Sequence, residues 1–464
     1  MKVLLVKPFG IADEIIPPVS LGLLATHIRD YHSVKILDAL KEGLNGTAVA
    51  KMVKREDIDV VGFQIWTKDI HNVREISNII KSLRPDTKII VGGIHPTVSP
   101  EGTMRFFDKS IDFAYQGEGE IGFKLFLDAI ESDEGPVAMK KVPGLVWKDG
   151  HDIKVNNNKL NENLDSLGFP AWDMMPPSTY PKAPHGAFYR NFPIAPIIVT
   201  RGCPFPCTYC SANILSDGKL RSRSVEHVIE ELKMLYHKFG VREFQIEDDN
   251  FTLNRKYVYQ FCERLLSENL NLTWSFPNGI RLDTIDRKLL KLMKRAGCYA
   301  LNFGIESGSQ RILNMIKKKL TLEQITEELT LVHEEGYEIG GFFILGFPTE
   351  TREEIEDTIR FACTLPLDRI AVSYFQPFPK THLYQELIEK GEINEDWVNQ
   401  QSLSLQCLSY VPQTITAIEL RQFRTKMLKR FYFRVKPFLK MLSQFRSPSH
   451  SYYIIKRSIR WLKV

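Results

Sequence analysis

Short apolar runs alternate with helix-period stretches along the first 130 residues. Between the runs, Leu21–Arg29 and Val73–Leu83 repeat apolar residues at the spacing of one helix face. Strands that alternate with helices form a parallel sheet, which binds ligands beyond the carboxyl ends of its strands. The pattern predicts a doubly wound, Rossmann-like α/β domain over residues 1–135. Its expected strands are Lys2–Lys7, Val34–Asp38, Val60–Gln64 and Lys88–Gly92.

The pattern changes after residue 135. We expect a hairpin over residues 144–155, because Asp149 and Gly150 form a common tight turn between two short apolar runs. Residues 156–196 are rich in Asn and Pro, which favours irregular backbone. The sequence therefore predicts a connector over residues 136–195.

Strand and helix patterns resume over residues 196–400. Thr321 with Gln324, and Thr351 with Glu354, have the spacing of capping boxes that open helices. Six strand and helix units predict a partial (β/α)6 barrel with its chemistry at the carboxyl ends of the strands. After the first strand, the expected strands are Glu243–Ile246, Thr273–Phe276, Ala300–Ile305, Gly341–Leu345 and Ala371–Tyr374.

Residues 401–464 predict a basic, helical C-terminal region, with helices over 419–446 and 451–464 separated near Pro448. Residues 419–464 contain thirteen Lys and Arg and one acid, a net charge of +12, whereas the whole chain of 464 residues carries +5. Two interpretations stay open: a cap on the barrel, or a peripheral contact with an anionic membrane. A nucleic-acid partner is not expected, because no RNA-binding module or Gly-Arg repeat is present.

Seven cysteines divide into three that share one loop and four that stand alone. The loop places Cys203, Cys207 and Cys210 in a C-x3-C-x2-C array. This is a cofactor pattern of a reducing compartment rather than a disulfide framework. The alternatives are a zinc site or unpaired structural thiols. Zinc prefers four protein ligands, and no fourth Cys or His is near. With no signal peptide or membrane span in the pattern, we expect a cytoplasmic protein.

Three thiolates can hold three irons of a [4Fe–4S] cluster and leave the fourth iron open. The triad, with Tyr209 before its last cysteine, resembles the cluster loop of the radical S-adenosylmethionine (SAM) enzymes. The resemblance implies that the open iron binds SAM and that an electron, from a reductant such as ferredoxin or flavodoxin, splits it into methionine and a 5′-deoxyadenosyl radical. It also implies cofactor contacts at Tyr209, Glu247, Asp248, Asp249, Asn278, Arg281, Glu306, Ser307, Gly346 and Glu350.

The N-terminal domain resembles the cobalamin-binding domain that precedes one large group of radical SAM enzymes. Cobalamin domains that supply their own imidazole ligand use Asp-x-His-x-x-Gly, whereas the stretch from Asp38 to Gly43 has Leu40 at the histidine position. Because Leu40 cannot ligate cobalt, we expect bound cobalamin to lack that ligand. The residues expected near cobalamin are Pro18, Ser20, Asp38, Gln64, Gly92, Gly93, His95, Thr97, Gly117, Glu118 and Gly119.

The two resemblances imply a cobalamin-dependent radical SAM methyltransferase, which methylates an unactivated carbon through methylcobalamin. One alternative is a radical SAM enzyme for cyclisation, coupling or oxidation without methyl transfer. Another is a cobalamin or redox sensor, although a sensor would not require the full run of SAM motifs. If the basic region contacts a membrane, we expect an apolar or lipid-like substrate; if it caps the barrel, a soluble small molecule.

Overall fold

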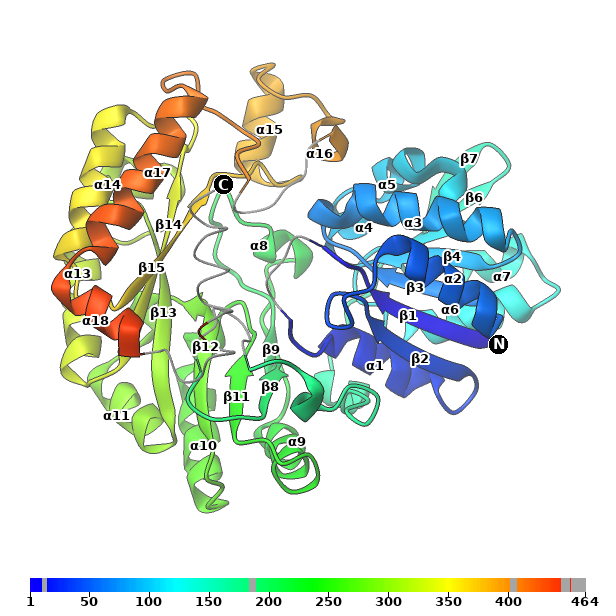
Figure 1. Ribbon diagram of the computed structural model, residues 1–464, viewed down its shortest axis with the longest axis horizontal. Coiled ribbons are helices and arrows are strands. Elements are labelled where there is room, and N and C mark those ends of the chain that lie inside the picture. The colour runs from blue at the N-terminus through cyan, green and yellow to red at the C-terminus, as the bar shows by residue number, and fades with distance from the viewer. Residues whose placement is uncertain (11–14, 183–188, 401–406, 444–450, 452–464) are drawn as a thin grey trace. The chain divides into compact units, whose positions relative to one another are not determined.

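The computed structural model describes residues 1–10, 15–182, 189–400, 407–443 and 451. The chain forms two compact units. The first comprises Met1–Tyr180 and Leu387–Ser404, and the second comprises Pro181–Glu386 and Leu405–Val464. Each unit contains its own large sheet (Figure 1).

The first unit is built on a seven-stranded sheet in the order β2-β1-β3-β4-β5-β6-β7. The pairs from β2 to β5 are parallel, and β5, β6 and β7 pair antiparallel. This sheet confirms the predicted Rossmann-like architecture. Its strands are β1 (Lys2–Lys7), β2 (Ser33–Asp38), β3 (Val60–Gln64), β4 (Lys88–Gly92), β5 (Phe113–Tyr115), β6 (Leu145–Asp149) and β7 (Asp152–Val155).

Helices cover both faces of this sheet, and each face has its own core. Leu4 and Val6 pack in one cluster, and Val3 and Leu5 pack in the other. Since alternate residues of β1 point to opposite faces and both faces are covered, the strand is a continuous apolar run. The helices are α1 (Val19–Ile28), α2 (Gly46–Glu56), α3 (Ile70–Leu83), α4 (Ile94–Val98), α5 (Pro100–Phe107), α6 (Gly122–Glu131), α7 (Pro136–Lys140) and α16 (Trp397–Gln400).

The expected connector is divided between the two units. The predicted hairpin forms β6 and β7, and β6 adds to the edge of β5, with Phe113 opposite Trp147. The hairpin satisfies backbone groups that the edge of β5 would leave unpaired. The chain through Tyr180 belongs to the first unit, and residues 387–404 return to it from much later in the sequence.

The second unit is built on a six-stranded parallel sheet in the order β15-β14-β13-β12-β11-β8, which confirms the predicted partial barrel. Figure 1 shows α10, α11, α13 and α14 on its outer side. A small antiparallel pair, β9 (Thr200–Arg201) with β10 (Arg221–Ser222), leads from β8. The strands of the main sheet are β8 (Ile194–Ile197), β11 (Glu243–Ile246), β12 (Thr273–Ile280), β13 (Cys298–Glu306), β14 (Glu338–Leu345) and β15 (Arg369–Tyr374).

The helices of the second unit begin with the expected caps. The capping boxes at Thr321 and Thr351 are both present, and a third at Thr416 opens α17. These helices are α8 (Ala212–Leu215), α9 (Val225–Lys238), α10 (Arg255–Ser267), α11 (Arg287–Arg295), α12 (Gln310–Met315), α13 (Leu322–Glu334), α14 (Arg352–Thr364), α17 (Ala417–Tyr432) and α18 (Val435–Ser443). The helix α15 (His382–Glu389) crosses the boundary between the units in the sequence.

The basic C-terminal region contains two helices among the described residues, α17 and α18, so the single helix expected over 419–446 is interrupted at residues 433–434. The second helix expected there, over residues 451–464, lies almost entirely outside the described residues. Among the described helices, none is long and apolar enough to cross a membrane.

Candidate active site

The three predicted cluster ligands lie in the loop between β9 and α8. Gly202 begins this loop with a φ of 98°, and a Cβ there would lie 2.2 Å from the carbonyl oxygen of Lys219. Glycine is therefore required at the entrance to the loop. Further along, the backbone N–H of Thr208 donates to the carbonyl oxygen of Ile316 at 3.1 Å. The loop therefore passes close to other backbone at Gly202 and is hydrogen-bonded to it at Thr208.

The cysteines suit a cluster better than a single metal ion. Cys203, Cys207 and Cys210 are free and partly buried. Burial raises the pKa of Cys203, and it raises the pKa of Cys210 to about 12. Thiolates at these positions therefore require nearby positive charge, which cluster irons supply. No three His, Cys, Asp or Glu side chains of the described residues converge on one ion site. A cluster makes no such demand, because each thiolate binds a different iron.

Two aspartates after β11 bind the backbone that leads into the cluster loop. The Asp248 carboxylate accepts hydrogen bonds from the backbone N–H of Val199 at 2.8 Å, the N–H of Thr200 at 2.7 Å and the Thr200 hydroxyl at 2.7 Å. Burial raises the pKa of Asp248 to about 7, because it outweighs the opposite effect of these hydrogen bonds. Burial raises the pKa of Asp249, and the backbone N–H of Gly202 opposes this shift. Asp248 therefore holds the backbone that leads into the loop, and the expected contact of both residues with SAM stays a prediction.

Two amides lie at the ends of the neighbouring strands. Asn278 donates from Nδ2 to the backbone oxygen of Glu247 at 2.8 Å and to its carboxylate at 3.0 Å, so these two predicted residues are brought together. Asn250 is only 1% exposed, and neither its Oδ1 nor its Nδ2 has a hydrogen-bond partner among the described residues. The sequence reasoning missed Asn250, although its place directly after an acidic run at a strand end could have indicated it.

A buried ion pair lies at the end of β13. Lys318 Nζ is 2.8 Å from Glu306 Oε1, and both side chains are buried. Burial, followed by the charge of the Glu306 carboxylate, raises the pKa of Tyr209. Lys318 was not predicted, because a run of three lysines usually marks a solvated surface. Lys317 and Lys319 have φ of 52° and 56°, and this irregular backbone places the lysine between them inside the protein.

Arg281 follows β12 and lies against the cluster loop. Its Nη1 is 4.0 Å from Cys207 Sγ, and its guanidinium carbon is 3.8 Å from the centre of the Phe205 ring. The resemblance implied a SAM contact at Arg281. The structure places the guanidinium beside a cluster ligand.

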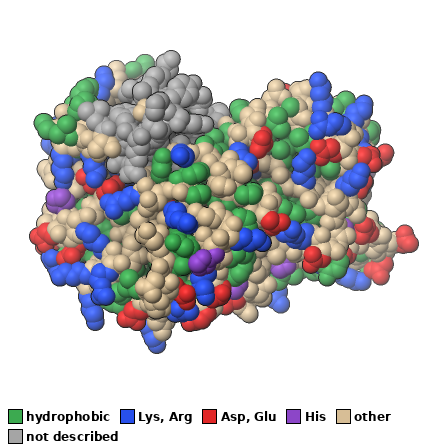
Figure 2. All heavy atoms as spheres, turned by 60° about the horizontal axis from the view of Figure 1, so that its bottom comes forward, with side chains coloured by type: hydrophobic (Ala, Val, Ile, Leu, Met, Phe, Trp, Pro, Cys, Tyr) green, Lys and Arg blue, Asp and Glu red, His purple; other side chains and the backbone are tan. Residues whose placement is uncertain are grey.

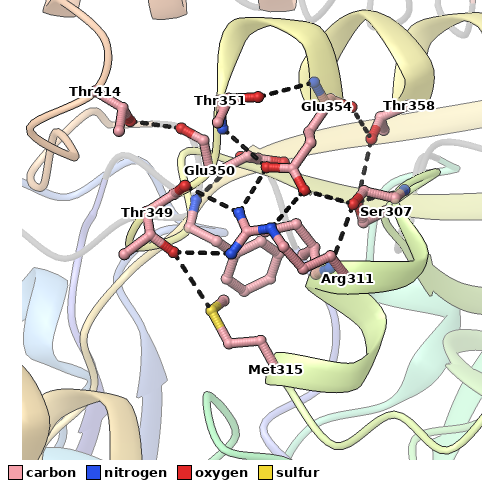
Figure 3. A network of polar contacts seen from close by, with 12 residues as sticks. Ser307, Arg311, Met315, Thr349, Glu350, Thr351, Glu354, Thr358 and Thr414 are labelled. Carbon is pink, nitrogen blue, oxygen red and sulfur yellow. Dashed lines mark hydrogen bonds and ion pairs between the residues drawn. The ribbon is translucent and has the colours of Figure 1, made fainter.

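The last predicted SAM contacts belong to a polar network around β13 and β14 (Figure 3). Ser307 Oγ is 3.1 Å from Thr358 Oγ1. The buried Glu350 accepts from the backbone N–H of Gly346 at 2.6 Å and of Phe347 at 3.1 Å. Burial raises the pKa of Glu350 to about 8, although these two bonds lower it. Its other carboxylate oxygen has no partner among the described residues. In this structure Ser307 and Glu350 therefore fix the strand ends.

In the first unit, Thr97 joins two of the predicted glycine loops. Its hydroxyl donates to the carbonyl oxygen of Gly93 at 2.7 Å and accepts from the N–H of Gly117 at 2.9 Å. Gly93 has a φ of 111°, and a Cβ there would lie 2.7 Å from the carbonyl oxygen of Ile65. The loops after β4 and β5 are thus held together with bare backbone at the carboxyl ends of the strands.

Three further positions bear on a cobalt ligand. His95 is completely buried, its Nδ1 is 3.2 Å from Thr67 Oγ1, and its Nε2 has no partner among the described residues. Burial lowers the pKa of His95 to about 4. Asp38 is buried and pairs with Lys7 at 3.2 Å. Leu40 follows in the turn after β2. The imidazole of His95 is buried, and Leu40 has no imidazole. Neither position therefore offers an exposed imidazole to cobalt.

The remaining predicted residues of this unit lie at the carboxyl ends of its strands or in the segments that follow them. Gln64 Nε2 is 3.4 Å from the hydroxyl of Ser20, which is exposed. Glu118 accepts from the N–H of Asn161 at 2.9 Å, and the carbonyl oxygen of Pro18 accepts from Gly22 at 3.0 Å. Gly92 ends β4, and Gly119 lies in the loop after β5. Exposed polar groups and close glycine backbone at the strand ends fit the amide-rich periphery of a corrin cofactor.

Comparisons with known proteins agree with both parts of this arrangement. The Radical SAM superfamily model matches residues 197–362, and the B12 binding domain model matches residues 11–127. The uncharacterized methyltransferase PH0819 of Pyrococcus horikoshii is 33% identical over 478 residues, which cover 100% of this chain and 98% of the relative. The chain therefore belongs to the family of radical SAM enzymes with a cobalamin-binding domain. The predicted cofactors, a [4Fe–4S] cluster, SAM and cobalamin, are confirmed by these matches.

More distant relatives carry out different reactions. The cytidylyl-2-hydroxyethylphosphonate methyltransferase of Streptomyces wedmorensis is 27% identical over 89% of this chain and 86% of its own. The anaerobic magnesium-protoporphyrin IX monomethyl ester cyclase of Rubrivivax gelatinosus is 28% identical over 81% of this chain and 67% of its own. The radical SAM methyltransferase TsrM of Kitasatospora setae, solved with cobalamin and a cluster, shares the fold with a TM-score of 0.69. It is 17% identical, and the match covers 94% of this chain and 86% of that one.

Proposed function

We propose that this enzyme transfers a methyl group to an unactivated carbon of a small molecule. The observation that carries the proposal is the match to the Pyrococcus horikoshii methyltransferase over essentially both whole chains. It is supported by the cysteine triad and the glycine loops described above, which fit the cluster and the corrin. When bound, the cluster would supply the electron that splits SAM into methionine and a hydrogen-abstracting 5′-deoxyadenosyl radical, and cobalamin would carry the methyl group of a second SAM.

The protein's own residues have positioning roles in this proposal. Cys203, Cys207 and Cys210 each hold one iron. Asp248 fixes the backbone before the triad, so that Cys203 would present its thiolate at a constant place relative to the strand ends. Such fixed geometry matters, because a radical reacts with whatever lies within contact distance.

Transfer of labelled methyl groups tests the proposal. Anaerobic protein with SAM deuterated in its methyl group, a reductant and cell extract should form a product that carries the label only when cobalamin is present. If 5′-deoxyadenosine forms but no product carries the label, the non-methylating alternative is correct. That alternative draws support from the cyclase relative. If 5′-deoxyadenosine does not form with intact cluster, a sensor role is favoured.

We further propose that the substrate is apolar or lipid-like and reaches the enzyme from an anionic membrane. The support comes from α17 and α18. Between residues 420 and 443 the chain has eight Lys and Arg and no acid. By contrast, Lys and Arg alternate with Asp and Glu over the face drawn in Figure 2. Basic residues near an anionic bilayer contribute about 1 kcal/mol each.

Apolar side chains stand among these basic residues. Ile418 is 67% exposed, Phe433 is 79% exposed and Leu439 is 57% exposed. An open groove lies along α17 and is lined by Ile418, Arg421, Gln422, Thr425, Lys426, Lys429, Arg430 and Phe433. Exposed apolar residues interleaved with positive charge are typical of helices that lie in the membrane interface. A soluble acidic partner would use the charge but leave the apolar side chains in water.

Flotation with lipid vesicles tests the membrane contact without SAM or cofactors. The protein should float with anionic vesicles at low salt and less at high salt, because the attraction is screened. Lys429→Glu with Arg430→Glu should abolish flotation. The matched control, Lys51→Glu with Lys54→Glu on exposed positions of α2, should not. If the wild type stays at the bottom of the gradient, α17 and α18 are a structural cap and a soluble substrate is favoured.

A further inference from the structure

The guanidinium of Arg281 is held rigidly in the protein. It forms a two-pronged pair with Asp283, from Nε to Oδ1 at 2.9 Å and from Nη2 to Oδ2 at 2.8 Å. Nη2 also donates to the carbonyl oxygen of Lys318 at 2.9 Å. The side chain of Arg281 is buried. An arginine whose Nε and Nη2 are already bound to protein cannot turn a free fork toward the carboxylate of a ligand.

The remaining donor faces a cluster ligand. Nη1 lies 4.0 Å from Cys207 Sγ, and the face of Phe205 covers the guanidinium at 3.8 Å. Both residues belong to the cluster loop, so that the loop contacts the cation at two points. The aromatic face also keeps water from one side of the charge, which strengthens its effect on nearby groups.

A positive charge at this place acts on the redox state of the cluster. Reduction of the [4Fe–4S]²⁺ core to [4Fe–4S]⁺ adds one electron, which the protein's reductant supplies, and makes the cluster and its three thiolates more negative. A nearby cation and an N–H donor directed at a ligand sulfur both favour the more negative state. Asp283 offsets part of this charge, since its carboxylate lies on the far side of the same guanidinium.

We propose that Arg281 is a redox-tuning residue that raises the reduction potential of the cluster through Cys207, and that it is not a SAM carboxylate ligand. The proposal requires the cluster of this family but does not depend on methyl transfer. Its geometry explains why an arginine, rather than a lysine, suits the position: only a planar fork can satisfy Asp283, the Lys318 carbonyl and the cysteine sulfur together.

A redox titration of the reconstituted holoenzyme, followed by electron paramagnetic resonance without SAM, tests the proposal. For Arg281→Gln we expect the ratio of reduced to oxidised cluster at a fixed potential to fall about tenfold, equivalent to a reduction potential lower by about 59 mV for a one-electron couple. Arg281→Lys keeps the charge and should shift the potential less. Asp283→Asn removes the offsetting negative charge and should shift the potential upward, which keeps the test decisive if the glutamine variant does not fold.

Arg255 provides a matched control. Arg255 binds the segment that follows Arg281, through the backbone oxygens of Asp283 and Thr284. Among the described residues, it has no hydrogen bond to a cysteine. Arg255→Gln should leave the potential unchanged. The variants are compared at equal iron content. Equilibrium binding of SAM to each variant measures the alternative role of Arg281, as a ligand of the SAM carboxylate. Arg281→Gln with full iron, an unchanged potential and weakened SAM binding would overturn the proposal. An equal shift in Arg255→Gln would overturn it as well.

Discussion

Replacement of Asp248 by Ala should loosen the backbone that enters the cluster loop. The carboxylate accepts three hydrogen bonds of 2.7 to 2.8 Å, two of them from the backbone N–H groups of Val199 and Thr200. Alanine leaves both N–H groups buried without an acceptor, whereas the Thr200 hydroxyl can rotate to another partner. A buried donor without an acceptor costs about 1–3 kcal/mol, so we expect a loss of about 2–6 kcal/mol.

That loss is a large part of a typical domain stability of about 5–15 kcal/mol. Urea unfolding of the anaerobic apoprotein at pH 8, followed by tryptophan fluorescence, to which the buried Trp274 contributes, measures it. Asp248→Asn keeps one acceptor oxygen, so its free energy of unfolding should fall by about half as much as that of Asp248→Ala. Glu263→Ala, at an exposed position of α10, serves as the control and should stay within about 0.5 kcal/mol of the wild type.

The same variant should also bind less iron, because Asp248 holds the chain three residues before Cys203. An Asp248→Ala protein that unfolds within about 1 kcal/mol of the wild type would refute the reasoning, since unmet buried donors cannot be that inexpensive.

Three further predictions concern other parts of the two units. Lys318→Met should cost about 3–5 kcal/mol by leaving the Glu306 carboxylate buried without its partner, and adding Glu306→Gln should recover part of this loss in denaturant unfolding. If Lys318→Met and the double variant lost the same free energy of unfolding, the result would contradict the Lys318–Glu306 ion pair. Glu350 has its pKa raised from 4.5 to about 8, so wild-type stability should fall as pH rises through that window, because the unfolded carboxyl ionises first. Glu350→Gln should reduce this slope by up to about 1.4 kcal/mol per pH unit, and identical slopes would refute the assignment. With Leu40 at the histidine position, cobalamin bound as Co(II) should show no nitrogen superhyperfine splitting from a protein imidazole in its paramagnetic resonance spectrum.

The fold was predictable wherever local pattern decides it. The continuous apolar runs Lys2–Lys7 and Val60–Gln64 coincide with β1 and β3, and the capping boxes at Thr321 and Thr351 open α13 and α14. Pairing over long sequence distances was not predictable. Nothing in the hairpin itself specifies that β6 adds to β5, and nothing in residues 387–404 indicates that they return to the first unit.

The cysteine triad was the most informative part of the site, because its chemistry depends on spacing alone. The acidic residues after β11 were less informative. A carboxylate at a strand end can face a ligand or its own neighbouring backbone, and only the structure shows that Asp248 faces Val199 and Thr200. Lys318 was overlooked for the opposite reason. A lysine in a charged run is normally solvated, but this one is buried against Glu306. Burial of polar side chains is a tertiary property, which sequence patterns do not record.

The central claim is that the three cysteines of one loop hold the cluster that cleaves SAM. Protein purified anaerobically should contain about four irons per chain and should form 5′-deoxyadenosine from SAM when reduced. Alanine at Cys203, Cys207 or Cys210 should abolish both, whereas Cys363→Ala, on α14 outside the loop, should preserve both. Iron content and SAM cleavage that are equal in all four variants would contradict the account.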